Sequence, residues 1–364
     1  MRVLHSATRV LAAAALAVLA VGCSKDSSGP NDSPFDPAGT SSDLNAVSAS
    51  FDSPALLAFD AASEDISAAT GGSASLALRA RPTAALAGGK ASAMRYAGAL
   101  AKALTSGPRP SLAVAAAAIP PDLLGTTFVY DVSVHQYAAS DLTGAPANGV
   151  RFLLYAVNPV TGVPTEPLTE VGFVDVVTTQ TSTAASVNIV VVSDNKTYLD
   201  YSAKVTATSA SSGTVAVSGY VTNGQDRVNF DMDNHITFGD STLDVTMDYT
   251  LTVPTRGGFR IDLEAGVTTS DVTNNTTVSL DITAQGDHGT VRVTGSETND
   301  TGTFQVKVNG SLFATIDVTA GGQPVVTGKD GEPLNAEEQA ALRDVFELFG
   351  GGLAFFVGLA PVPN

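Results

Sequence analysis

A strict alternation of apolar and polar residues constrains this chain more than any other feature of its sequence. In Ser241–Val253 (STLDVTMDYTLTV), apolar side chains occupy every second position, and threonine or aspartate fills most positions between them. Successive side chains of a strand point to opposite faces, so this pattern predicts a long strand with one apolar and one polar face. A glycine-containing turn follows, and Phe259–Val267 then repeats the alternation. The two runs together are typical of a hairpin.

Similar runs extend through most of the remaining chain, and glycine, asparagine and aspartate cluster between them. They lie near residues 128–137, 150–157, 171–178, 186–193, 197–208, 213–222, 227–238, 278–282, 289–297, 302–309 and 311–319. Short turns between consecutive strands favour antiparallel pairing. We therefore predict a mainly β fold, a large antiparallel meander that forms a curved sheet, a half-barrel or a barrel.

The apolar face of such a sheet must be covered, and the C-terminal segment supplies a candidate. Asn335 and Glu338 have the spacing of a capping box, which marks the start of a helix. Leu342, Val345, Phe346 and Phe349 then follow at helical spacing. We predict that this C-terminal helix packs on the apolar face.

Eight apolar residues are our candidates for lining the interior or an apolar ligand site. They come from the two clearest strands and from the C-terminal helix: Leu243, Val245, Met247, Tyr249, Ile261, Leu263, Phe346 and Phe349.

The N-terminus has the features of a targeting segment. Arg2 and Arg9 precede an uncharged apolar run, Val10–Val21. Its twelve residues are fewer than the roughly 20 that a membrane-spanning helix needs, so the run reads as a signal peptide. The stretch Leu19-Ala20-Val21-Gly22-Cys23 resembles the lipobox of bacterial lipoproteins.

This resemblance implies that residues 1–22 are removed and that Cys23 carries the lipid, a diacylglycerol thioether with an amide-linked acyl chain such as palmitate. More than one acyl chain gives stable membrane anchoring. Ser24 in the next position is similar to the outer-membrane sorting pattern of diderm bacteria. We therefore expect a lipid-anchored protein of the cell envelope, on the outer membrane of such a bacterium and facing the periplasm or the cell surface.

Composition divides the rest of the chain into four parts. Residues 23–42 are rich in serine, proline and glycine and are predicted to form a lipidated flexible tether. Residues 43–120, rich in alanine and serine, are predicted to be helical or partly disordered, with short helices after Ser53-Pro54 and over Lys90–Thr105. Residues 121–330 form the predicted β domain, and residues 331–364 the capping helix and apolar tail.

Charge and cysteine content exclude several classes of partner and site. The formal charge is −17, with 36 acidic and 19 basic side chains, which argues against nucleic acid and anionic surfaces as partners. A single cysteine excludes an internal disulfide and a thiolate zinc cluster. The expected partners are the membrane, through the N-terminal lipid, and a hydrophobic small molecule or lipid; protein partners stay open.

No motif of a known catalytic or metal site is present. The sequence contains neither Gly-x-Ser-x-Gly nor His-Glu-x-x-His, and His135, His235 and His288 are widely separated, so we predict no catalytic residue, no metal ligand and no cofactor. Acids on the polar faces of neighbouring strands are expected to form a solvated surface, partly neutralised by Arg260; calcium binding or carbohydrate chemistry is the alternative for them. These acids are Asp244, Asp248, Asp262, Glu264 and Asp281.

The sequence therefore favours a non-enzymatic envelope lipoprotein that binds an apolar ligand such as a lipid. In architecture alone it is similar to the half-barrel carriers and periplasmic lipid-binding lipoproteins of diderm bacteria, although no residue motif assigns the β domain to a family. The alternative is a structural or adhesive surface module with a filled core and no ligand cavity.

Overall fold

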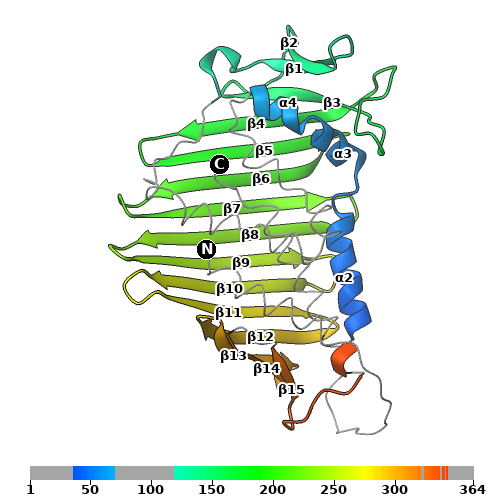
Figure 1. Ribbon diagram of the computed structural model, residues 1–364. Coiled ribbons are helices and arrows are strands. Elements are labelled where there is room, and N and C mark those ends of the chain that lie inside the picture. Colours follow the sequence, from blue (N-terminus) through cyan, green and yellow to red (C-terminus); the bar gives the residue numbers. More distant parts are fainter. Residues whose placement is uncertain (1–35, 70–118, 321–323, 337, 341, 343–364) are drawn as a thin grey trace. The chain divides into compact units, whose positions relative to one another are not determined.

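The computed structural model describes residues 36–69, 119–320, 324–336, 338–340 and 342. Fifteen strands form one sheet in the order β15-β14-β13-β12-β11-β10-β9-β8-β7-β6-β5-β4-β3-β1-β2 (Figure 1). The order follows the chain from β3 onward, as in a meander, and ends at β15 and β2, so the described strands form an open sheet and not a barrel. The sheet is mostly antiparallel; β1 and β3 are parallel. This is the mainly β meander that the alternation predicts.

The strands run from Thr127 to Gly328, and several of them have 12 residues. Their bounds are β1 Thr127–Asp131, β2 Gln136–Ser140, β3 Gly149–Tyr155, β4 Glu170–Gln180, β5 Ala184–Ser193, β6 Lys196–Ala207, β7 Ser212–Thr222, β8 Arg227–Phe238, β9 Thr242–Val253, β10 Phe259–Ser270, β11 Asn275–Gly286, β12 Gly289–Thr298, β13 Thr301–Val308, β14 Ser311–Val318 and β15 Val325–Gly328.

One predicted run is wrong in detail. Residues 128–137 alternate like a single strand, but the structure places a turn between β1 and β2 there. His135 has a φ of 54°, in the left-handed region, and Asp131 accepts a hydrogen bond from the backbone N–H of Ser133, 2.8 Å away. This local aspartate turn competes with strand continuation, and the alternation alone does not reveal it.

The chain divides into two compact units, whose boundary in β8 falls between Asp233 and Asn234. The first unit contains the described residues 46–69 and 119–233, and we call it the β1–β8 unit. The second contains the described residues 36–45 and 234–342, and we call it the β8–β15 unit. Each is described below by itself.

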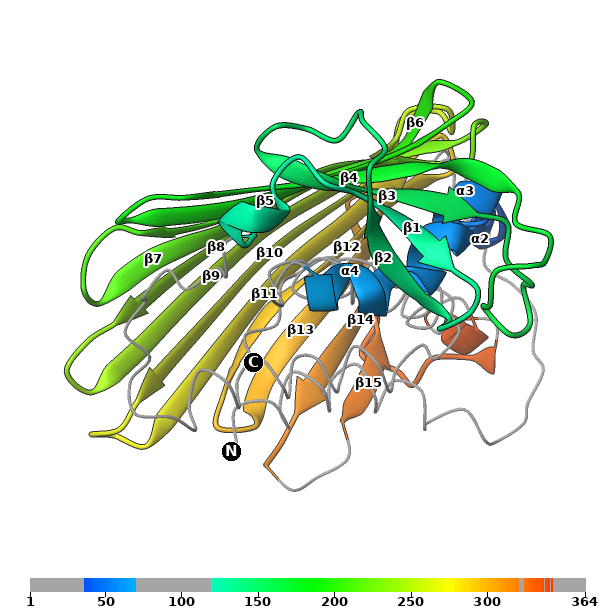
Figure 2. The same ribbon diagram turned by 90° about the horizontal axis from the view of Figure 1, so that it is seen from above.

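Two short helices cover one face of the β1–β8 unit. Helix α3 (Pro54–Ala61) contacts β3 to β6, and α4 (Ser63–Ala69) contacts β2 (Figure 2). Ser53 caps α3 by accepting a hydrogen bond from the backbone N–H of Leu56, and Pro54 is its first residue, as the sequence predicts. Leu56 is buried, as are Val174 and Ile189 on strands that α3 contacts, and this burial holds the short helix in place.

Aromatic side chains hold the β1–β2 hairpin to β3, where the parallel ladder is only two residue pairs long. Phe128 of β1 stacks on Phe152 of β3, with ring centroids 4.5 Å apart. Tyr137 of β2 meets Phe152 edge-on, and its hydroxyl donates to the carbonyl oxygen of Leu153 over 2.7 Å. These contacts compensate for the short ladder.

The β8–β15 unit has a regular two-faced sheet. Most apolar residues of β9 to β14 lie on one face, and the following ones are buried there: Leu243, Val245, Tyr249, Leu251, Val253, Phe259, Ile261, Leu263, Val278, Ile282, Ala284, Val291, Val293, Phe304, Val306, Ala314, Ile316 and Val318. The opposite face carries threonine, serine and charged side chains. The period-two pattern of the sequence therefore corresponds to true burial.

Helix α2 (Pro37–Ala49) corrects the predicted tether, because residues 37–42 are helical and not part of a flexible linker. Asp36 caps it: its Oδ1 accepts a hydrogen bond from the backbone N–H of Gly39 over 3.0 Å, and its carbonyl oxygen accepts from Thr40. Asp36-Pro37 thus repeats the cap-and-proline signal of Ser53-Pro54. A composition of serine, glycine and threonine obscured that signal in the sequence.

The predicted capping box at the C-terminal helix is confirmed. The backbone N–H of Asn335 donates to Glu338 Oε2, and that of Glu338 donates to Asn335 Oδ1, each over 2.9 Å. Leu342 is buried. Phe346 and Phe349 lie outside the described residues, as do the predicted signal peptide, Cys23 and the predicted helix over Lys90–Thr105. Docking of the C-terminal helix on the sheet therefore stays a prediction. No helix within the described ranges is long and apolar enough to cross a membrane.

Candidate functional site

The predicted interior residues of β9 and β10 come together on one face of the β8–β15 unit. The ladder places Tyr249 opposite Leu263 and Leu251 opposite Ile261. Ile261 is fully buried and Leu263 nearly so. Leu243 and Val245 are buried on the same face. The predicted candidates on these two strands thus form one continuous apolar surface.

Met247 is the exception among these residues, because it is only half-buried. It pairs with Ala265, which is too small to cover it and is itself only half-buried. Another molecule can therefore contact the Met247 side chain without a change in the packing of the sheet. A flexible, polarisable thioether adapts to apolar partners of different shape.

A polar anchor lies within the apolar surface. The hydroxyl of Tyr249 donates a hydrogen bond to Asn234 Oδ1 over 2.6 Å, and both residues are buried. Burial raises the pKa of Tyr249, which keeps its hydroxyl protonated and able to donate at neutral pH. This bond ties β8 to β9 and satisfies two polar groups that would otherwise be costly to bury.

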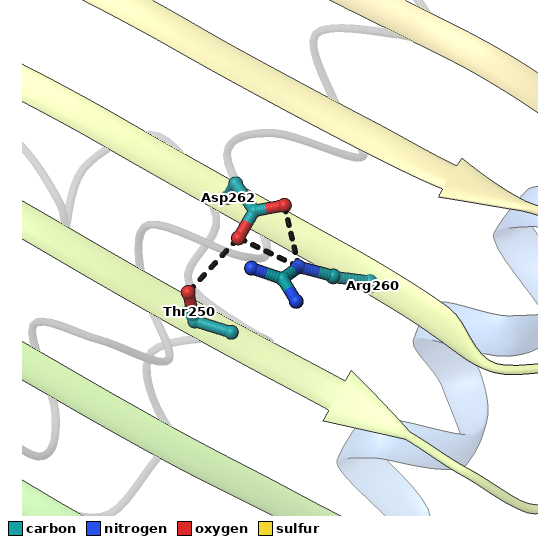
Figure 3. A network of polar contacts seen from close by, with 3 residues as sticks. All are labelled: Thr250, Arg260 and Asp262. Carbon is teal, nitrogen blue, oxygen red and sulfur yellow. Dashed lines mark hydrogen bonds and ion pairs between the residues drawn. The ribbon is translucent and has the colours of Figure 1, made fainter.

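The opposite face of the same strands carries ion pairs. Figure 3 shows Asp262 between two neighbours: its Oδ1 accepts from Thr250 over 2.9 Å, and its Oδ2 lies 2.6 Å from Arg260 Nε. Arg260 and Asp262 are partly exposed, so their pair is worth little stability. The geometry confirms that Arg260 partly neutralises the acids of this face.

Three acids stand side by side across β9, β10 and β11. Glu264 pairs with Asp248 on one side and with Asp281 on the other. Asp281 is neutralised by Arg292, whose Nε donates to its Oδ1 over 2.8 Å. Among the described residues, no group of three or more His, Cys, Asp or Glu side chains is arranged to hold a metal ion. This row of acids, together with Asp244 farther along β9, lies on the polar face of the sheet.

His135, His235 and His288 lie in different elements of the fold. His135 sits in the β1–β2 turn and His235 is exposed on β8. His288 lies in the β11–β12 turn and contacts the start of α2. This contact could not be predicted, because the start of α2 falls in residues 23–42, which were predicted to be a flexible tether.

No protein-family model matches the sequence, and neither a curated protein nor a solved structure matches it. The fold itself therefore defines the class of protein: a mainly β chain built on one long, open meander sheet with short helices. The candidate site that it offers is an apolar strand face, with Met247 as its most accessible apolar side chain among the predicted lining residues of β9 and β10.

Proposed function

We propose that this chain is a lipid-anchored lipoprotein of the bacterial cell envelope whose sheet binds an apolar ligand, such as a lipid acyl chain, without catalysing a reaction. One observation carries the ligand-binding part of the proposal, namely the continuous apolar surface that β9 and β10 share. Leu251 faces Ile261 on it, and the half-buried Met247 lies on the same face. An elongated apolar surface suits a flexible acyl chain, whose burial is favourable in proportion to its area.

The anchoring part of the proposal rests on the lipobox-like stretch Leu19–Cys23. The expected result is that cells expressing the full chain incorporate an alkyne analogue of palmitate into it and that the protein fractionates with the outer membrane. Cys23→Ser is expected to abolish both. Labelling that survives in Cys23→Ser would contradict the assignment of the lipid to this residue.

The ligand-binding part is tested with purified Cys23→Ser protein, in which the anchor cannot add lipid of its own. Native mass spectrometry after gentle desolvation is expected to find a co-purified apolar molecule, and a fluorescent fatty acid is expected to bind. Met247→Ser is expected to weaken binding of the fatty acid at least several-fold, because it removes apolar contact area without opening the buried core.

The matched control is Thr246→Ser, since Thr246 is the neighbouring residue on the polar face of the same strand. It is expected to leave binding unchanged. Equal losses in both variants would mean that the fatty acid does not bind on the apolar face.

A second candidate function is a structural or adhesive surface module. The complete burial of Leu251, Val253 and Ile261 favours it, because side chains at this density resemble a filled core. The same experiment separates the two functions. Protein that carries no apolar molecule and binds no fatty acid, while its apolar face stays packed, is a structural module.

A further inference from the structure

A line of half-buried residues crosses β9 to β12 on the apolar face of the β8–β15 unit. The strands lie side by side (Figure 1), and their ladders place one member of the line on each strand, directly opposite the next: Met247, Ala265, Leu280 and Gly295. All four are half-buried. We call this line the half-buried row.

The parallel lines of residues on its two sides are better covered. One side consists of buried residues only: Tyr249, Leu263, Ile282 and Val293. On the other side Val267 is half-buried, and the remaining members are buried: Val245, Val278 and Glu297. The accessible part of this apolar face is therefore concentrated in a narrow strip that runs across the strands.

Phe304 of β13 closes the strip at one end. It lies opposite Gly295 in the ladder and is 1% exposed. Gly295 cannot be exchanged for a larger residue, because a Cβ there would collide with the backbone of Thr303 and Phe304. The half-buried row therefore has no side chain on β12 and ends at a buried aromatic ring on β13.

The dimensions of the half-buried row suit a single alkyl chain. From Met247 to Gly295 it spans three strand spacings, about 14 Å, which is roughly the length of an extended alkyl chain of 12 carbons. Two of its four members, Ala265 and Gly295, are too small to cover their neighbours. Covering this strip with an alkyl chain removes apolar surface from water, which is favourable in proportion to the area.

The charges of the unit indicate which end of such a ligand lies at Phe304. The basic residues of the described strands β9 to β14 all belong to the opposite, polar face: Arg260, Arg292 and Lys307. The ionisable side chain beside Gly295 on the apolar face is Glu297, which is an acid. A ligand carboxylate therefore has no basic side chain of these strands to pair with at this end, whereas an uncharged methyl end fits there.

We propose that one unbranched acyl chain binds along the half-buried row, perpendicular to the strands, with its methyl end at Phe304 and its head group at the Met247 end. This inference rests on the proposed lipid-binding function and adds the position, direction and length of the ligand. Phe304 limits the part of the chain that the sheet covers to roughly 12 carbons. It is therefore the residue that determines chain-length specificity.

The test uses purified Cys23→Ser protein and saturated fatty acids of about 8 to about 18 carbons, which compete with a fluorescent fatty acid. The affinity is expected to increase with chain length up to about 12 carbons and then to stay level, because further carbons find no apolar surface to cover. Phe304→Ala lengthens the row by one strand spacing, so it is expected to move this limit by about four carbons.

Because the loss of the buried Phe304 ring also costs stability, a second variant fills the row instead. Ala265→Leu places a branched side chain in the path of the ligand and is expected to lower the affinity for every chain length by roughly tenfold. The matched control is Thr268→Leu, which puts the same side chain on the exposed polar face of the same strand. It should bind like the parent protein, and urea unfolding checks that each variant is folded.

The outcomes distinguish this inference from the proposed function. Fatty acids that bind, but with an affinity that keeps increasing up to about 18 carbons, would overturn the limit set by Phe304. Equal affinity of Ala265→Leu and the parent protein would overturn the position of the ligand. In both cases lipid binding itself would stand. A parent protein that binds no fatty acid of any length would overturn the proposed function, and this inference with it.

Discussion

At the scale of single residues, two arginine–aspartate ion pairs should differ in how much they stabilise the fold, because they differ in burial. Arg151 of β3 and Asp175 of β4 form a two-pronged pair, with Nε and Nη2 each 2.7 Å from a carboxylate oxygen. Both side chains are mostly buried, and the guanidinium also lies over the ring of Phe173. The corresponding pair on β11 and β12, Arg292 and Asp281, is more exposed. Burial and stacking should make the first pair the stronger one.

We expect Arg151→Lys to lower the free energy of unfolding by about 1–2 kcal/mol, because lysine cannot form the two parallel hydrogen bonds or stack on Phe173. Arg292→Lys serves as the control and should cost clearly less, because solvent screens this exposed pair. The measurement is urea unfolding followed by circular dichroism. Equal losses in the two variants would contradict the role of burial.

Two aspartates of the β1–β8 unit should respond to pH with opposite signs. Burial raises the pKa of Asp65 in α4, whose carboxylate also accepts a hydrogen bond from the backbone of Tyr137. Hydrogen bonds from the side chain and backbone of Ser133 lower the pKa of Asp131. The folded state therefore disfavours the ionised form of Asp65 and favours that of Asp131.

Asp65→Asn is expected to stabilise the protein at pH 7, and the gain should shrink as the pH falls and the native carboxyl becomes protonated. Asp131→Asn is expected to destabilise it at pH 7, and the loss should disappear as the pH falls below the ordinary range of aspartate. Urea midpoints of both variants and the native chain at pH 7 and pH 3.5 measure these differences. The same sign of pH dependence in both variants would contradict the two pKa directions.

At the scale of secondary-structure elements, the burial of a side chain decides how much that residue of a strand contributes to the free energy of unfolding. Ile261 of β10 is fully buried, while Met247 of β9, on the same face, is half-buried. We expect Ile261→Ala to cost about 2–5 kcal/mol, since it leaves a cavity that close-packed neighbours fill only in part. Met247→Ala should cost about 1 kcal/mol or less, because water already reaches part of the side chain.

Thermal unfolding of the two variants measures this contrast. A larger loss for Met247→Ala than for Ile261→Ala would mean that the apolar face is packed differently from the structure. That outcome would also remove the reason for choosing Met247 to test ligand binding.

At the scale of the whole molecule, the net charge of −17 is the dominant electrostatic property. The chain has 36 acidic and 19 basic side chains. On the polar face of β9 to β11, Glu264 lies between two further acids, Asp248 and Asp281. In a compact chain with a large net negative charge, the acidic side chains repel one another, and salt screens that repulsion. Stability should therefore depend on ionic strength more strongly than in a chain of balanced charge.

We expect the urea midpoint at pH 7 to rise when the sodium chloride concentration increases from about 0.01 M to about 0.3 M, a range over which the screening length falls from about 30 Å to below 8 Å. Asp248→Asn and Glu264→Gln, which reduce the repulsion directly, should each make this increase smaller. An unfolding midpoint that falls with added salt would show that attractive ion pairs outweigh the net repulsion.

Much of the fold could be predicted because the relevant signals are local. The alternation over Ser241–Val253 predicts β9 and its two faces, and the glycine-containing turn after it predicts the hairpin with β10. The Ser53 cap and the Asn335–Glu338 capping box predict where two helices begin. Each of these signals lies within a few residues and depends on backbone geometry that neighbours in the chain decide.

Other features depended on contacts between distant parts of the chain. Alternation predicts an apolar face for each strand but not whether the sheet closes, because closure depends on the pairing of its two end strands. The structure shows an open sheet that ends at β15 and β2. The composition around Asp36 predicted a tether, but residues 37–42 are helical, and Gly39 and Asp43 of that helix lie against His288. The sequence by itself thus determined most of the strands, their two faces and the starts of two helices, because those follow from local backbone preference. The tertiary structure decided the open topology and the partner of α2, because both depend on side chains that only folding brings together.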